Sequence, residues 1–127
     1  MRKVGGNMLE KNREYKFYEV INELREKYIK IGEKELYKDN NWCVYANDDE
    51  VYLNSNCYID KYPEIDDDTY EEKVPEFILK KELGLVFRDE LLQDVVVSTL
   101  KRKENASNEE LMEAVNYYDD NDTFLEL

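Results

Sequence analysis

The sequence predicts an α+β domain in which a small antiparallel sheet, of about three to four strands, packs against three to four helices. Apolar residues recur at helical spacing towards both ends of the chain, whereas apolar and polar residues alternate over residues 42–60. A chain of 127 residues is long enough to bury one core and too short for two. We therefore expect one domain over residues 13–127, preceded by a disordered leader at residues 1–12 in which Met8 offers an alternative start to Met1.

The first helix is expected over residues 14–31, with its end at Gly32. Glu23 and Lys27 have the i,i+4 spacing that stabilises an exposed helix face. Beyond the helix, Leu36 and Tyr37 form either a short strand or an anchor. The apolar stripe that faces the core consists of Phe17, Val20, Ile21, Leu24, Tyr28 and Ile31.

Three short strands are expected at residues 42–46, 51–53 and 57–60, because clusters rich in Asn, Asp and Ser separate them. Cys43 and Cys57 would then point to opposite faces of strands that are not neighbours, so we predict free thiols. One face carries Trp42, Val44, Val51, Leu53, Cys57 and Ile59, and the other carries Tyr45, Tyr52 and Tyr58. The tyrosine face either binds a partner or lies beneath another element, and the second interpretation is preferred.

The second half of the chain predicts three helices and one more strand. Pro75 opens a short helix that reaches Glu82 and stops at Gly84, and a strand follows at residues 85–87. Asp89 caps a longer helix, although three consecutive valines within it favour a strand. A capping box of Ser107 and Glu110 starts the last helix, and an acidic, partly ordered tail follows it. The two buried stripes consist of Leu92, Val95, Val96, Thr99 and Leu100, and of Leu111, Ala114, Val115 and Tyr118.

The candidate functional segment is the acidic stretch at residues 61–73. Carboxylates with so few basic neighbours repel one another, so we expect an extended, solvated loop until a basic surface neutralises it. Tyrosines between the carboxylates supply rigid contact area of the kind found at interfaces. The predicted partner-binding residues are Tyr62, Asp66, Asp67, Asp68, Tyr70, Glu71 and Glu72.

The overall charge points to a basic protein partner. The chain has 31 acidic and 18 basic residues, a formal charge of -13, which argues against direct binding to nucleic acid or to an anionic membrane. Surplus acid can also serve solubility alone. No signal peptide or apolar membrane-spanning run is apparent, so we expect a cytoplasmic protein. A monomer and a dimer both remain open.

The residue types present argue against an enzyme. Histidine, the commonest general base and a common metal ligand, is absent. Asp119, Asn121 and Thr123 have part of the spacing of a calcium loop, but Phe124 occupies the position where such a loop needs glycine. We therefore predict no catalytic residue, no metal site and no cofactor, and a metal-dependent enzyme is the weakest hypothesis.

Several short segments together carry a resemblance to a known family. They are Trp42 with Val44-Tyr45, then residues 56–60, the acidic stretch, and residues 75–77, 91–96, 110–111 and 114–119. This succession resembles a family of small uncharacterised bacterial domains of unknown function. Since these are chiefly core and turn positions, the resemblance implies a fold and no active site. In size, acidity and lack of catalytic groups the chain is also similar in character to immunity proteins that neutralise bacterial toxins.

The leading functional hypothesis is a small acidic protein-binding module. It would act as an immunity or inhibitor protein that occludes the active site of a basic bacterial toxin, such as a nuclease. The alternative is a phage or mobile-element inhibitor that imitates the charge of nucleic acid and blocks a host DNA-binding protein. Both hypotheses place the contact on the acidic stretch.

Overall fold

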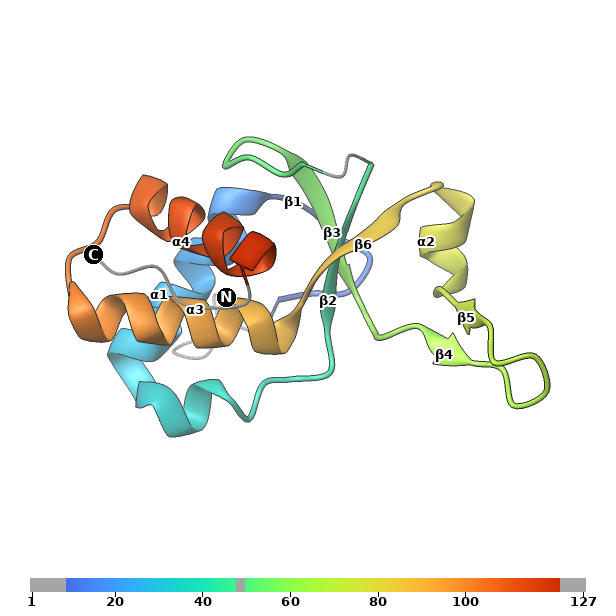
Figure 1. Cartoon of the computed structure of the whole chain (residues 1–127), viewed down its shortest axis with the longest axis horizontal. Helices are drawn as coiled ribbons and strands as arrows, with labels where there is room; N and C mark the ends of the chain where they lie inside the picture. The colour runs from blue at the N-terminus through green and yellow to red at the C-terminus, as the bar shows by residue number, and fades with distance from the viewer. Residues whose placement is uncertain (1–8, 48–49, 122–127) are drawn as a thin grey trace, which may run out of the picture.

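The computed structural model describes residues 9–47 and 50–121, and it confirms the α+β class. A four-stranded antiparallel sheet with the order β1-β3-β2-β6 lies at the centre, and β4 and β5 pair in a separate two-stranded sheet (Figure 1). The strands are β1 (Glu14–Lys16), β2 (Cys43–Ala46), β3 (Asn56–Asp60), β4 (Glu64–Ile65), β5 (Glu72–Lys73) and β6 (Gly84–Arg88). The helices are α1 (Phe17–Leu36), α2 (Glu76–Lys80), α3 (Asp89–Arg102) and α4 (Asn108–Asn121).

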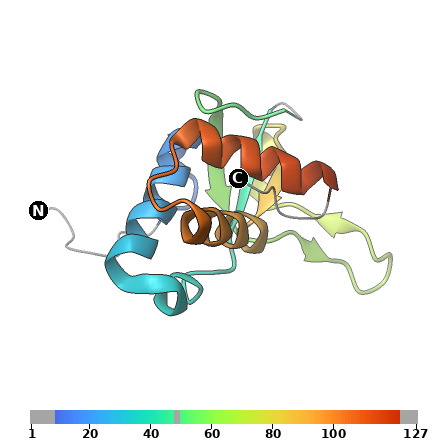
Figure 2. The ribbon, with the colours of Figure 1, turned by 60° about the vertical axis from the view of Figure 1, so that its left-hand side comes forward.

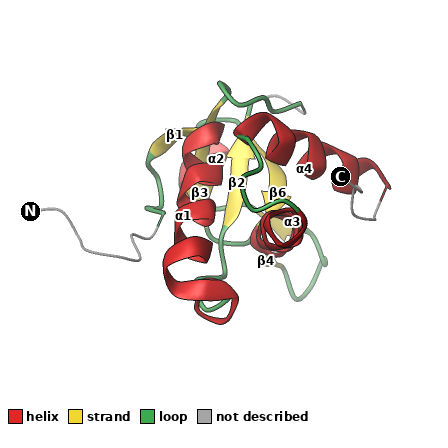
Figure 3. Cartoon of the chain, turned by 90° about the vertical axis from the view of Figure 1, so that its left-hand side faces the viewer, coloured by secondary structure: helices red, strands yellow, loops and turns green. Residues whose placement is uncertain are grey.

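The four-stranded sheet separates two apolar clusters of unequal size. Helices α1, α3 and α4 cover one face, as the views in Figures 2 and 3 show, and their buried residues form the larger cluster with Val44, Cys57 and Ile59. On the other face Ile78 of α2 packs against Cys43 and Tyr45. We call residues 61–83 the lobe and the remaining described residues the body.

Helix α1 differs from the prediction at both ends. Residues 14–16, predicted as helix, form β1 and pair with residues 56–58 of β3. The helix begins at Phe17, and the carboxylate of Glu19 accepts a hydrogen bond of 2.8 Å from the N–H of Lys16. Gly32 has a φ of 86°, which favours glycine, so it bends the helix instead of ending it. The helical turn after the bend buries Leu36, which therefore serves as an anchor.

Most of the predicted stripe of α1 is buried, but the predicted exposed pair is wrong. Glu23 is half-buried, and Lys27 is buried and pairs with Asp39 beyond the end of the helix. Its long apolar stem lies under the connection between α1 and β2, so the charge reaches a carboxylate there. Ile31 is exposed, because the stripe leaves the core near the bend at Gly32.

The strand predicted at residues 51–53 is absent from the structure, and β2 pairs directly with β3. Residues 50–55 instead form a turn whose carbonyl groups serve the start of α1. The N–H groups of Phe17 and Tyr18 donate to the carbonyls of Ser55 and Leu53, each at 2.9 Å. The first N–H groups of a helix have no acceptor within the helix. The carbonyls of Leu53 and Ser55 therefore pair with the start of α1 and not with a neighbouring strand. Residues 48–49 of the predicted preceding turn lie outside the described residues.

The tyrosine face is covered, as the preferred interpretation predicted. Tyr45 is fully buried, and the ring of Tyr58 packs edge-on against Phe77 of α2 at 5.4 Å between centroids. Tyr52 departs from the prediction because it lies in the turn and is exposed. Both cysteines are free and buried, as predicted, although β2 and β3 are neighbours: the two side chains lie in the two different apolar clusters.

The second half of the chain follows the prediction except at two helix ends, since Arg88 and not Asp89 is the N-cap of α3 and the end of α2 also differs. Helix α2, strand β6 and helices α3 and α4 all form, and the capping box holds with Ser107 N–H to Glu110 at 2.9 Å and Glu110 N–H to Ser107 at 3.1 Å. The predicted left-handed stop at Gly84 is wrong. Glu82 has the positive φ, 56°, and Gly84 already pairs with Ala46 in the sheet.

The ends of the described chain bear on the predicted leader and tail. Leu9 packs against the larger cluster, and the N–H of Asn12 donates to the carbonyl of Ile59 at 2.9 Å, while residues 1–8 of the predicted leader lie outside the described residues. Asp119 and Asn121 belong to α4, and residues 122–127 of the predicted tail also lie outside the description. None of the helices in the described residues is both long and apolar enough to cross a membrane.

Candidate partner-binding site

The acidic stretch folds into a hairpin that projects from the lobe, away from α1, α3 and α4 (Figures 1 and 2). The prediction of an extended loop is therefore wrong, and the cause is the side chain of Asp66. Its Oδ1 atom accepts hydrogen bonds from the N–H groups of Asp68 at 2.8 Å and Thr69 at 3.0 Å. An aspartate at the start of a turn stabilises the reversal in this way. Tyr70, with a φ of 59°, closes the turn.

The hairpin carries more negative charge than it neutralises. Lys73 pairs with Asp66 at 3.1 Å, and Lys61 lies 3.5 Å from Glu64. The backbone N–H groups of Thr69 and Asp68, followed by Lys73, lower the pKa of Asp66. Within the described residues, no ion pair reaches the other carboxylates of the hairpin. These uncompensated carboxylates belong to Asp67, Asp68, Glu71 and Glu72.

Apolar side chains lie exposed among these charges. Tyr70 is 80% exposed and Ile65 is 56% exposed, both on the hairpin. Exposed side chains of this kind can supply apolar contact area to a partner. The hairpin thus combines uncompensated charge with apolar contact area.

Tyr62 is separated from the other predicted site residues. It lies at the base of the hairpin, half-buried, and its hydroxyl donates a hydrogen bond to the buried carboxylate of Asp89. Burial, and after it this carboxylate, raise the pKa of Tyr62. The guanidinium of Arg88 lies 5.2 Å from the centre of its ring. Its hydroxyl is therefore engaged within the chain and does not extend from the tip of the hairpin.

Asp89 joins three parts of the chain that are remote in sequence. The prediction that it caps α3 is wrong, because Arg88 takes the N-cap position and Asp89 is the first residue of the helix, where it is 1% exposed. Its carboxylate accepts hydrogen bonds from the N–H groups of Asn41 at 2.6 Å and Glu90 at 2.8 Å, besides the hydroxyl of Tyr62. The base of the lobe, the start of α3 and the start of β2 are thereby held together.

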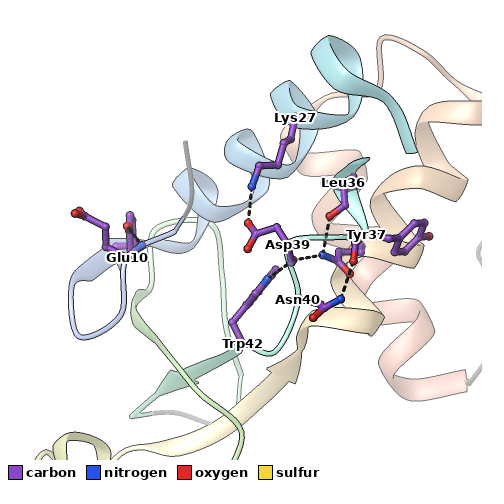
Figure 4. Close-up of polar contacts among 9 residues, drawn as sticks. Glu10, Lys27, Leu36, Tyr37, Asp39, Asn40 and Trp42 are labelled. Carbon is purple, nitrogen blue, oxygen red and sulfur yellow. Dashed lines mark hydrogen bonds and ion pairs between the residues drawn. The ribbon is translucent and has the colours of Figure 1, made fainter. Parts of the chain in front are cut away.

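The connection between α1 and β2 is fixed by polar contacts (Figure 4). Lys27 reaches Asp39, whose carbonyl accepts hydrogen bonds from Trp42 Nε1 at 2.9 Å and Gln93 Nε2 at 2.8 Å. The side-chain amide of Asn40 donates to the carbonyl of Tyr37 at 2.9 Å. These contacts hold residues 37–41 beside α3.

A polar cleft of about 390 Å³ opens between this connection, Tyr62 and the start of α3. The side chains of Tyr37 and Tyr62 contribute to its walls, and Glu90 and the buried Gln93 also line it. Sequence reasoning did not identify this cleft, because its residues come from three segments and share no local pattern. Among the described residues, no group of three or more Cys, Asp or Glu side chains is arranged to hold a metal ion.

Taken together, the fold and the hairpin define a small α+β domain that carries an acidic projection. Residues 32–127 match the model of a family described as a domain of unknown function (DUF7716), and the chain belongs to this family. The expectation of an uncharacterised small-domain family is thereby confirmed. No curated protein and no solved structure matches the chain.

Proposed function

We propose that this protein is a binding module that inhibits a basic protein partner, as an immunity protein neutralises a bacterial toxin. The observation that carries the proposal is the hairpin, in which four uncompensated carboxylates lie beside the exposed side chains of Ile65 and Tyr70. Charge of this kind attracts a basic surface from a distance, and apolar side chains stabilise the contact once water has left it.

The proposed mechanism is occlusion of an active site. A toxin that cleaves nucleic acid binds phosphates through lysine and arginine residues, and the hairpin carboxylates would occupy those cations in place of the substrate. The hairpin is held to the sheet through Val74, Phe77 and Ile78, which pack in the smaller apolar cluster. A projection anchored in this way enters a cleft with little loss of conformational freedom. The proposal places the protein in the cytoplasm, with its target.

The test is an affinity pull-down from the source organism, eluted with a salt gradient, in which the retained proteins are identified. One basic protein that elutes at moderate salt supports the proposal, and a nuclease among the retained proteins identifies the toxin. A host DNA-binding protein in its place would favour mimicry of nucleic acid. If nothing is retained even at low salt, the proposal is wrong and the acidic surface serves solubility.

A matched pair of variants assigns the contact to the hairpin. The first variant carries Asp67→Asn, Asp68→Asn, Glu71→Gln and Glu72→Gln. The control carries Glu26→Gln, Glu104→Gln, Glu109→Gln and Glu113→Gln, which are exposed, form no ion pair within the described residues and change the net charge equally. We expect the hairpin variant to lower the association rate with the retained protein by roughly tenfold at low salt, because steering depends on local charge. Equal effects of the two variants would exclude the hairpin as the contact.

A further inference from the structure

The polar cleft beside the hairpin contains an acceptor that the fold leaves unused. Gln93 is 1% exposed, and its Nε2 atom donates to the carbonyls of Leu36 at 3.3 Å and Asp39 at 2.8 Å. These two acceptors fix the orientation of the amide, since only its nitrogen can donate. Within the described residues no group donates to its Oε1 atom.

The exposure of this oxygen to solvent can be inferred from the hydrogen bonds of the other buried atoms. Among the described residues, every completely buried side-chain nitrogen or oxygen atom has a hydrogen-bond partner. The Oε1 atom of Gln93 lacks one, so it must retain contact with solvent. For a residue that is 1% exposed and lines the cleft, that contact lies in the cleft. The cleft therefore has an unsatisfied acceptor in its floor.

The remaining lining groups favour a ligand that donates hydrogen bonds and carries positive charge. The carboxylate of Glu90 is exposed and forms no ion pair within the described residues. Asn40 uses its amide nitrogen in a hydrogen bond, whereas its Oδ1 atom accepts none from the described residues. Tyr37 and Tyr62 also line the cleft. The guanidinium of Arg88 lies over one face of the Tyr62 ring, so a ligand cation can stack on this ring only from its other face.

The charges around the cleft sum to a negative environment. The carboxylates are those of Asp89, Glu90 and Asp94, the last of which accepts a hydrogen bond of 2.7 Å from the hydroxyl of Tyr37. Against them stand Arg88 and the N-terminus of α3, which carries about half a positive charge. Asp39 is neutralised by Lys27. An anion is therefore repelled from the cleft and a cation attracted.

We propose that this cleft binds the guanidinium group of an arginine side chain of the partner. Guanidinium presents five N–H donors in one plane, which suits acceptors that lie on separate segments, and it stacks on aromatic rings. The inference rests on the proposed function, because Tyr62 links the cleft directly to the base of the hairpin. An arginine in the cleft anchors the partner while the hairpin carboxylates meet its other cations.

The experiment uses the whole protein and a small probe, N-acetyl-arginine methylamide, followed by NMR of the side-chain amide groups. We expect saturable shifts at Gln93 and Asn40 in the millimolar range. The neutral analogue N-acetyl-citrulline methylamide has nearly the same shape, so binding of equal strength would overturn the proposal. Binding of the lysine analogue as tight as that of arginine would overturn the assignment to guanidinium.

Glu90→Gln tests the charge without disturbing the fold, because this side chain is exposed and lies in the first turn of α3. The matched control is Glu109→Gln, in the first turn of α4. We expect Glu90→Gln to weaken arginine binding roughly fivefold and Glu109→Gln to leave it unchanged. Equal affinities of the two variants, or no shift at Gln93, would refute the proposal.

The two proposals fail separately. If the pull-down retains a basic protein but the arginine probe does not bind, the cleft is not an arginine site and the inhibitor proposal stands. If the probe binds but no protein is retained, the cation site stands and the inhibitor proposal is wrong.

Discussion

The helices of the body and the lobe pack on opposite faces of β2, and they differ in how they are held. Buried residues of α1, α3 and α4 pack on one face of β2, whereas on the other face Ile78 is the fully buried residue that the lobe contributes. All four residues of β2 are buried, so the strand is apolar on both sides. The region with the smaller cluster also carries the candidate partner-binding hairpin. Stability and binding are thus assigned to opposite faces of the same sheet.

The largest effect is expected from a cavity in the body. Leu92 of α3 is fully buried in the larger cluster. Leu92→Ala should lower the free energy of unfolding by about 4 kcal/mol, since it removes apolar contacts and leaves a cavity. Chemical denaturation followed by circular dichroism measures this change. The loss should appear in every probe, including those placed in the lobe; a loss confined to α3 would show that the body does not unfold as one unit.

A cavity in the lobe should have a smaller and more local effect. Ile78 is fully buried, but most of its neighbours in the smaller cluster are only partly buried and can move into the space. Ile78→Ala should therefore cost about 2 kcal/mol, at the low end for such a substitution. Hydrogen exchange should then accelerate at α2 and the hairpin while α3 and α4 keep their protection. Uniform acceleration through both regions would mean that the lobe and the body open together.

The two cysteines report, with the least perturbation, on the face of the sheet that the lobe covers and on the face that the helices of the body cover. Cys43 lies in the smaller cluster and Cys57 in the larger one, and burial raises the pKa of each thiol to about 12. Both thiols are thus protonated at neutral pH and react only when the structure opens. In the single-cysteine variants Cys57→Ala and Cys43→Ala, we expect the remaining Cys43 to react faster with a disulfide reagent than the remaining Cys57. The reverse order would assign the lower local stability to the body.

The elements predicted correctly from the sequence are those that local patterns determine. The apolar stripes of α3 and α4 each recur at helical spacing within one helix, and the capping box at Ser107 involves residues only three apart. Spacing alone therefore identifies them. The three valines of α3 form helix in spite of their preference for strands, because the periodicity places them against the core. Local patterns thus account for most of the helical layer.

The errors have their cause in partners that are remote in the chain. The predicted exposed pair of Glu23 and Lys27 is wrong because the spacing of these residues contains no information about Asp39. The predicted strand at residues 51–53 is wrong because a short apolar run does not show that the start of α1 donates hydrogen bonds to carbonyls there. In the candidate site the acidic stretch could be recognised from composition, but its hairpin could not, because the reversal depends on the hydrogen bonds that the side chain of Asp66 accepts. The cleft could not, because Tyr62, Asp89 and Gln93 meet only after the sheet has formed.

The position of β2 between β3 and β6 also bears on the order of folding. Pairing β2 with β3 closes only the short connection at residues 47–55, whereas pairing β2 with β6 closes a loop that contains the whole lobe. Longer loops lose more entropy on closure, and contacts distant in sequence form more slowly. We expect the β2–β3 pair to form early and the addition of β6 to follow. The hairpin that we propose as the binding surface would then reach its final position late in folding.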